Sequence, residues 1–99
     1  MVLGWFNAKD ADEFGKTLAG FYDEKFRANT QAADRKIATK QQKLVAEILA
    51  LTAQFKEQHK PNAFQKAKLG NSFKWRMRDL GHNNELIDLL TKDILLALR

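Results

Sequence analysis

The segment 73–80, "FKWRMRDL", concentrates the side chains in this chain that best suit binding of an anion or a nucleobase. It holds three cations, two large aromatic residues and a methionine. Aromatic rings stack on bases, and basic side chains pair with phosphates. At helical spacing, however, Phe73, Met77 and Leu80 fall on one face, which is typical of a core stripe. Trp75 projects away from that face, so its burial distinguishes a ligand surface from burial in a subunit interface, where Trp and Arg are enriched.

We expect the packed helix, in which the cationic side chains extend along apolar surface to reach water. The alternative is a surface for nucleic acid or another anionic partner, formed by Lys66, Lys68, Lys74, Trp75, Arg76 and Arg78. The chain has a net charge of +5, and residues 31–82 hold eleven Lys and Arg against four Asp and Glu. Such a basic middle segment permits an anionic partner without requiring one. Nucleic acid is therefore the second choice of partner.

Groups suited to catalysis are sparse. The chain has no cysteine, which excludes thiolate nucleophiles, disulfides and zinc–thiolate sites. Its only serine, Ser72, lacks a Gly-x-Ser-x-Gly context, and there is no phosphate loop or dinucleotide fingerprint. His82 and Glu85 have a spacing that could bind a metal, but no second pair accompanies them. We expect no enzymatic activity, no catalytic residue, no cofactor and no metal, and a small helical enzyme or metal protein is the third hypothesis.

The apolar spacing is helical along the whole chain, which predicts an all-α fold with four helices in an elongated bundle. The length of 99 residues suits a single domain, residues 1–99. The first expected helix starts after Asn7 or Asp10 and breaks at Asn29 and Thr30. A long central helix follows over about residues 31–60. The third helix covers about residues 63–80, and the fourth runs from Asn83 or Asn84 to about Leu98. Pro61 and Gly81 should end helices, and Asn62 with Gln65 has capping-box spacing.

Apolar seams on the central and last helices should drive folding and association. The candidate core or dimer seam consists of Ile37, Leu44, Ile48, Leu51, Phe55, Leu86, Leu90 and Ile94. A thirty-residue central helix would be about 45 Å long, whereas a compact domain of this length is about 33 Å across. The helix could bend, or the whole molecule could be an elongated hairpin, but we favour a second subunit that covers the overhang. We therefore expect a homodimer.

Small and aromatic residues near the N-terminus add two expectations. Gly15 lies beside the apolar stripe of the first helix, where it would let another helix approach closely, whereas Gly20 lies outside the stripe and only lowers helix propensity. Trp5 and Phe6 precede this helix and are interpreted as a lid over the core.

The expected function is that of a small non-enzymatic helical interaction or assembly protein, acting as a homodimer, with a protein partner possible. The alternative is an accessory protein that binds nucleic acid or another anionic partner through the basic middle segment. The sequence has no secretory signal pattern and no apolar run long enough to span a bilayer. We therefore expect a cytoplasmic protein without membrane insertion. The sequence indicates no particular ligand, partner or pathway.

Overall fold

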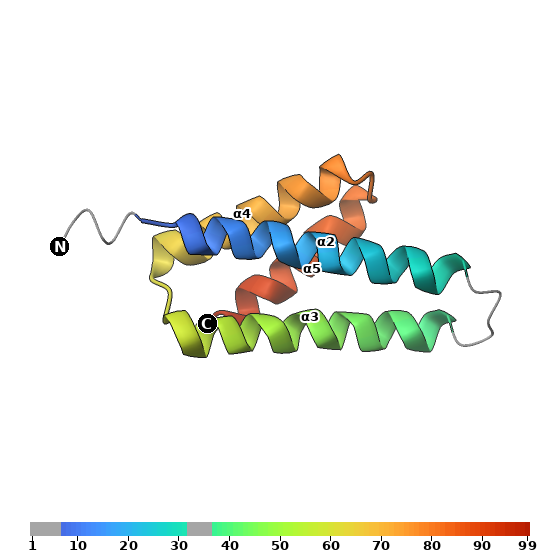
Figure 1. Ribbon diagram of the computed structural model, residues 1–99, viewed down its shortest axis with the longest axis horizontal. Coiled ribbons are helices and arrows are strands. Elements are labelled where there is room, and N and C mark those ends of the chain that lie inside the picture. Colours follow the sequence, from blue (N-terminus) through green and yellow to red (C-terminus); the bar gives the residue numbers. More distant parts are fainter. Residues whose placement is uncertain (1–6, 32–36) are drawn as a thin grey trace.

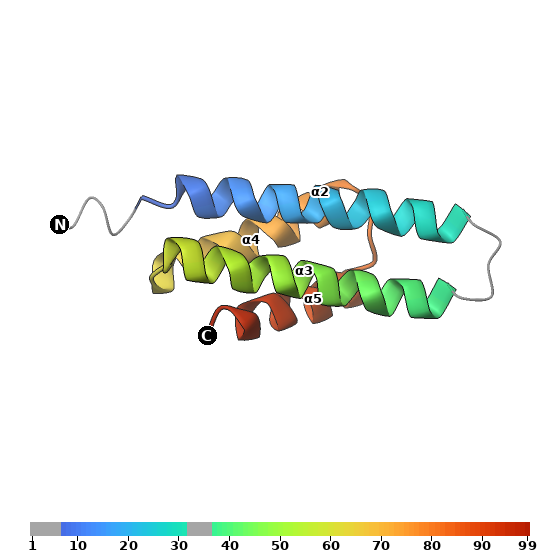
Figure 2. The same cartoon turned by 60° about the horizontal axis from the view of Figure 1, so that its bottom comes forward.

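A computed structural model describes residues 7–31 and 37–99, which form four helices and no strand. The helices are α2 (Lys9–Gln31), α3 (Ile37–His59), α4 (Ala63–Asp79) and α5 (Asn84–Ala97). Helices α2 and α3 lie side by side and antiparallel along the length of the molecule (Figure 1). Helix α4 packs closely on α2, and α5 packs against both α3 and α4 (Figure 2). The all-α prediction of a four-helix bundle is confirmed.

The predicted boundary between the first two helices is wrong. Helix α2 does not break at Asn29 and Thr30, and the Thr30 hydroxyl donates to the Arg27 carbonyl oxygen at 3.1 Å inside the helix instead of capping a new one. Asn and Thr disfavour a helix by only tenths of a kcal/mol, so packing overrides them. The predicted long helix over residues 31–60 is replaced by α3, whose 23 residues span about 35 Å. The overhang that suggested a second subunit therefore disappears.

Local signals located the other helix ends correctly. The Asn62 side chain accepts a hydrogen bond from the Gln65 backbone N–H at 2.9 Å, and the Gln65 side chain accepts one from the Asn62 N–H at 2.9 Å. This capping box starts α4. Asn83 starts α5 by accepting from the Glu85 N–H at 2.7 Å. Gly81 has a φ of 85°, a conformation that glycine adopts without strain, so it turns the chain between α4 and α5.

The core runs along the centre of the bundle. Its large buried side chains are Leu18, Tyr22, Leu44, Ile48, Phe55, Leu69, Phe73, Met77, Ile87, Leu90, Ile94 and Leu98. Leu51 and Leu86 are half-buried against this core. Most of the predicted seam thus packs within the monomer, so it is not available as a dimer surface. Ile37 is the first residue of α3, but its side chain lies outside the described part, as do Trp5 and Phe6.

Helices α2 and α4 approach each other closely at Gly15. A Cβ added to Gly15 would lie 2.5 Å from the Leu69 carbonyl oxygen and 3.1 Å from the Phe73 backbone nitrogen. Backbone therefore meets backbone at this point, and the prediction that Gly15 admits a neighbouring helix is confirmed. A Cβ added to Gly20 would meet nothing within 4 Å.

Candidate functional site

Trp75 is exposed on the outer face of α4. The residue keeps 55% of its surface accessible, whereas Phe73 and Met77 on the same helix are completely buried. The guanidinium carbon of Arg78 lies over the Trp75 ring, 5.1 Å from its centroid. A cation at this distance from an indole face is attracted to it and orients the ring. Within the monomer, Trp75 therefore belongs to a surface and not to the core.

A hollow of about 290 Å³ opens beside Trp75, between α2 and α4. Its lining contains the cations Lys16, Lys68 and Arg76, the polar residues Asn71 and Ser72, and the acids Asp12 and Asp79. We call Lys16, Lys68, Trp75, Arg76 and Arg78 the Trp75 surface. Residues from two helices thus place four cations and two acids around one aromatic side chain.

Asp12, at the floor of this hollow, is already engaged. Its carboxylate accepts a hydrogen bond from the Ser72 hydroxyl and lies 3.2 Å from the Lys16 ammonium. The Ser72 hydrogen bond, followed by that from Lys16, holds the pKa of Asp12 below its ordinary value. The negative charge of Asp12 is thus partly offset inside the protein.

The structure divides the six residues predicted as a partner surface. Lys68, Trp75 and Arg76 border the hollow, and Arg78 covers the tryptophan ring. Lys66 and Lys74 do not border it. Lys66 is half-buried, and the Lys74 ammonium lies 3.5 Å from the Asp88 carboxylate on α5.

Sequence reasoning missed Lys16, which comes from α2. Lys16 and Lys68 are far apart in the sequence and share one hollow because α2 and α4 are in close contact. Gly15, the neighbour of Lys16, could have indicated this position from the sequence, because the backbones of α2 and α4 meet there. A glycine that admits another helix also indicates which side chains lie beside that helix.

A second exposed surface lies on α5. Leu89, Leu95 and Leu96 keep 63%, 40% and 49% of their surfaces accessible. Leu89 and Leu96 are seven residues apart, so they lie on one face two helical turns apart. Glu85, Lys92 and Arg99 are exposed along the same face. We call these five residues, Glu85, Leu89, Lys92, Leu96 and Arg99, the α5 face.

His82 packs against α2. Its Nε2 atom lies 2.8 Å from Asp23 Oδ1, and its side chain is only 6% exposed. The imidazole edge also meets the rings of Tyr22 and Phe26, with centroids 5.8 and 5.1 Å away. Among the residues of 7–31 and 37–99, no three metal-binding side chains converge. The geometry gives His82 a role in joining the turn before α5 to α2.

Asp23 makes this junction sensitive to acid. Burial raises the pKa of Asp23, but hydrogen bonds and charge from Arg27 and His82 outweigh burial and hold the pKa below its ordinary value. A carboxylate with a lowered folded-state pKa contributes stability above its unfolded pKa of about 3.9, and the contribution is lost as the pH falls through the folded pKa. The ionised state of Asp23 therefore stabilises the fold at neutral pH.

We expect Asp23→Asn to be less stable than the wild type at neutral pH, with a deficit that shrinks below about pH 4. Urea unfolding at a series of pH values measures this difference. Glu24→Gln, an exposed neighbour on α2, is the matched control and should change stability little at any pH. A deficit of Asp23→Asn that is the same at pH 3 and pH 7 would contradict the prediction.

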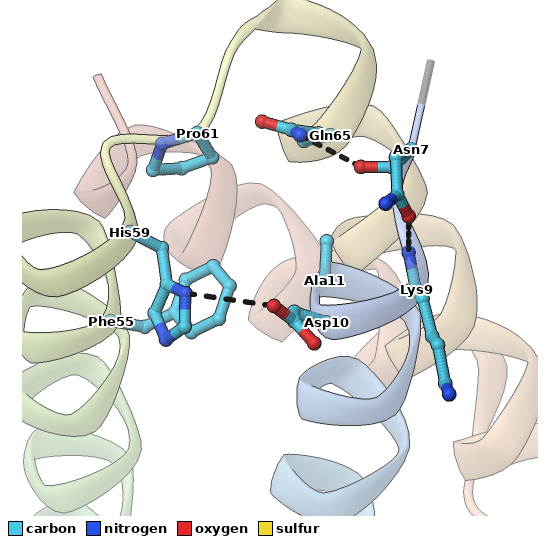
Figure 3. Close-up of a pocket in the computed structure, with 8 residues that line it drawn as sticks. All are labelled: Asn7, Lys9, Asp10, Ala11, Phe55, His59, Pro61 and Gln65. Atoms are coloured by element: carbon cyan, nitrogen blue, oxygen red, sulfur yellow. Dashed lines mark hydrogen bonds and ion pairs between the residues drawn. The ribbon is translucent and has the colours of Figure 1, made fainter. Parts of the chain in front are cut away.

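A second hollow, of about 250 Å³, lies where the start of α2, the end of α3 and the start of α4 meet (Figure 3). His59 stacks on Phe55, with centroids 4.3 Å apart, and its Nδ1 lies 4.0 Å from an Asp10 carboxylate oxygen. The Gln65 side-chain amide donates to the Asn7 carbonyl oxygen at 2.8 Å. These contacts link the start of α2 to the end of α3 and to the start of α4. We therefore interpret this region as a structural junction of three helix ends.

No protein-family model matches this chain, and comparisons with curated proteins and with solved structures found no match. In the described ranges, no helix is both long and apolar enough to cross a membrane. The exposed surfaces on α4 and α5 are therefore the observations from which a function can be proposed.

Proposed function

We propose that this chain is a small non-enzymatic assembly protein that forms a homodimer through the α5 face. The observation that carries this proposal is the exposure of Leu89 and Leu96, at 63% and 49%, on one side of a helix whose other side is buried. Removing such apolar surface from water is worth about 25 cal/mol per Å². Exposed leucines on the same face of a helix, two turns apart, offer apolar surface that a second copy can cover.

The order of residues along the α5 face suits a second copy in antiparallel orientation. Glu85 lies near one end, Arg99 at the other, and the two leucines lie between them. A twofold axis near Lys92 brings Glu85 close to the partner's Arg99 and each Leu89 opposite the partner's Leu96. A parallel arrangement would instead place Glu85 beside Glu85 and Arg99 beside Arg99, whereas the antiparallel one brings together like charges only at Lys92. Opposite charges of this kind select orientation and register more than they add affinity.

The interface must extend beyond α5. The 14 residues of α5 form a helix only about 21 Å long. One face of so short a helix is too small to bury the roughly 800 Å² that each partner contributes to a stable interface. A hollow of about 410 Å³ lies beside the α5 face and reaches Lys74 on α4, and Leu95 and Leu96 line it together with polar and charged side chains. We expect the second copy to cover this hollow as well as the α5 face.

Charge reversal tests the proposed orientation. We expect sedimentation equilibrium to show a wild-type dimer at micromolar concentration, weaker association for Glu85→Arg and for Arg99→Glu, and recovery in the double variant. Each reversal is unfavourable to the dipole of α5, so recovery in the double variant cannot come from a more stable helix.

Glu24→Arg, a reversal at an exposed site on α2, is the matched control and should leave the dimer intact. Circular dichroism checks that each variant remains helical. A wild-type protein that stays monomeric throughout the micromolar range would refute the dimer. A double variant as weak as the single ones would refute the antiparallel arrangement.

A further inference from the structure

We propose that the Trp75 surface binds single-stranded nucleic acid, with Trp75 stacking on a base while Lys16, Lys68, Arg76 and Arg78 bind the neighbouring phosphates. This inference concerns α2 and α4 and does not depend on the dimer proposed through α5.

The tryptophan provides the stacking platform. More than half of Trp75 is accessible, and Arg78 lies against its ring. The helix beneath it is held in place because Leu69, Phe73 and Met77 are completely buried in the core. A ring that is already oriented loses little conformational freedom when a ligand binds. Base stacking on such a ring does not depend on sequence, since every base has a π-face.

The charges around the ring suit a phosphate backbone. Four cations, Lys16, Lys68, Arg76 and Arg78, share this part of the surface with two acids, Asp12 and Asp79. Asp12 accepts from Ser72 and pairs with Lys16, so these two charges offset each other and Lys16 contacts a phosphate only by exchanging this partner. Lys68, Arg76 and Arg78 supply the remaining positive charge against Asp79. The Trp75 surface therefore carries a net positive charge next to its aromatic group, which is the combination found in proteins that bind single strands.

The shape favours a single strand over a duplex. A tryptophan can stack only on a base whose face is open, and bases in a duplex are covered by their neighbours. Reading a duplex would require a helix to enter the major groove, which is about 12 Å wide. Helix α4 packs against both α2 and α5, and the hollow beside Trp75 lies between α2 and α4. The exposed Trp75 ring borders this hollow of about 290 Å³, so a base with an open face can approach the ring from solvent.

Fluorescence and anisotropy titrations with a fluorescein-labelled oligothymidylate test the proposal. The chain has two tryptophans, so Trp5→Phe leaves Trp75 as the single reporter. We expect the oligonucleotide to quench Trp75, and the binding constant to fall with salt with a logarithmic slope of about −2 to −3, as for three or four phosphate contacts on a single strand. Trp75→Ala should weaken binding by roughly tenfold to a hundredfold, which corresponds to the loss of one stacked base.

Two lysines of α4 form a matched pair of controls. Lys68→Ala and Lys74→Ala remove the same charge from the same helix, but only Lys68 borders the hollow, whereas Lys74 pairs with Asp88. Lys68→Ala should lower both affinity and the salt slope, and Lys74→Ala should leave them close to wild type. With an oligonucleotide too short to reach two Trp75 surfaces, Glu85→Arg should bind as the wild type does, so failure of the dimer and failure of this site are distinguishable.

Several outcomes would overturn the proposal. These are no anisotropy change and no quenching at low salt, equal losses for Lys68→Ala and Lys74→Ala, or duplex DNA binding as tightly as the single strand. Quenching by polyglutamate as strong as that by the oligonucleotide would also overturn it and would indicate an acidic protein partner instead.

Discussion

Gly15→Ala should destabilise the protein by about 1–3 kcal/mol, because the new methyl group has no space. A Cβ at this position would lie 2.5 Å from the Leu69 carbonyl oxygen, which belongs to the backbone of α4. A flexible side chain could move aside, but a hydrogen-bonded helix backbone can yield only by shifting the whole helix. That shift would separate α2 from α4 and weaken the hydrogen bond between Ser72 and Asp12.

Gly20→Ala on the same helix is the matched control and should have the opposite sign. Its Cβ would meet nothing within 4 Å, so the variant should gain about 0.5–1 kcal/mol from the better helix propensity of alanine. Urea unfolding followed by circular dichroism measures both values. If the two substitutions changed the free energy of unfolding in the same direction, the close approach of α2 and α4 at Gly15 would be refuted.

Leu90→Ala should cost about 2–5 kcal/mol, whereas Leu89→Ala should change the stability of the monomer by no more than about 0.5 kcal/mol. The residues are adjacent and chemically identical, but Leu90 is 3% exposed and Leu89 is 63% exposed. Removing the Leu90 side chain leaves a cavity between α5 and the rest of the bundle. Denaturant midpoints at a dilute concentration, where the monomer prevails, measure the contrast. Equal midpoints for the two variants would show that α5 is rotated about its axis relative to this structure.

Leu51→Ala extends this comparison to α3. The sequence placed Leu51 in the same seam as Leu90, and equal burial would predict equal cost. In the structure Leu51 is half-buried and borders a hollow of about 500 Å³ with Phe21 and Gln54. Water already reaches part of this side chain, so we expect a smaller loss of stability than for Leu90→Ala.

The two proposed surfaces are separate and compatible. The α5 face and the Trp75 surface share no residue, and the hollows next to them are lined by different side chains. A dimer formed through α5 would therefore present two Trp75 surfaces. A strand long enough to reach both would bind more tightly than a short one, because its second contact is intramolecular.

Sequence patterns predicted those features that depend on neighbours within one or two helical turns. The capping box of Asn62 and Gln65, the cap at Asn83 and the turn at Gly81 all act over three or four residues. The same holds for the core stripe of Phe73 and Met77, since helical periodicity places those side chains together whatever the remaining fold.

The same kind of reasoning failed where packing outweighs local preference. Asn29 and Thr30 predicted a break, but α2 continues through them beside α3. The core stripe also predicted Leu80 among the buried residues, whereas it is half-buried just beyond the end of α4. At helix ends, local propensities are too small to decide which residues the neighbouring helices cover.

The surfaces were decided only by the tertiary structure. Periodicity showed that Trp75 projects away from the core stripe, but burial depends on whether another helix lies there, and none does in the described part of the chain. Lys16 joins Lys68 because two backbones touch at Gly15, a contact between residues more than fifty positions apart. Spacing along one helix determines which side chains share a face, whereas the packing of the helices determines which faces remain in water.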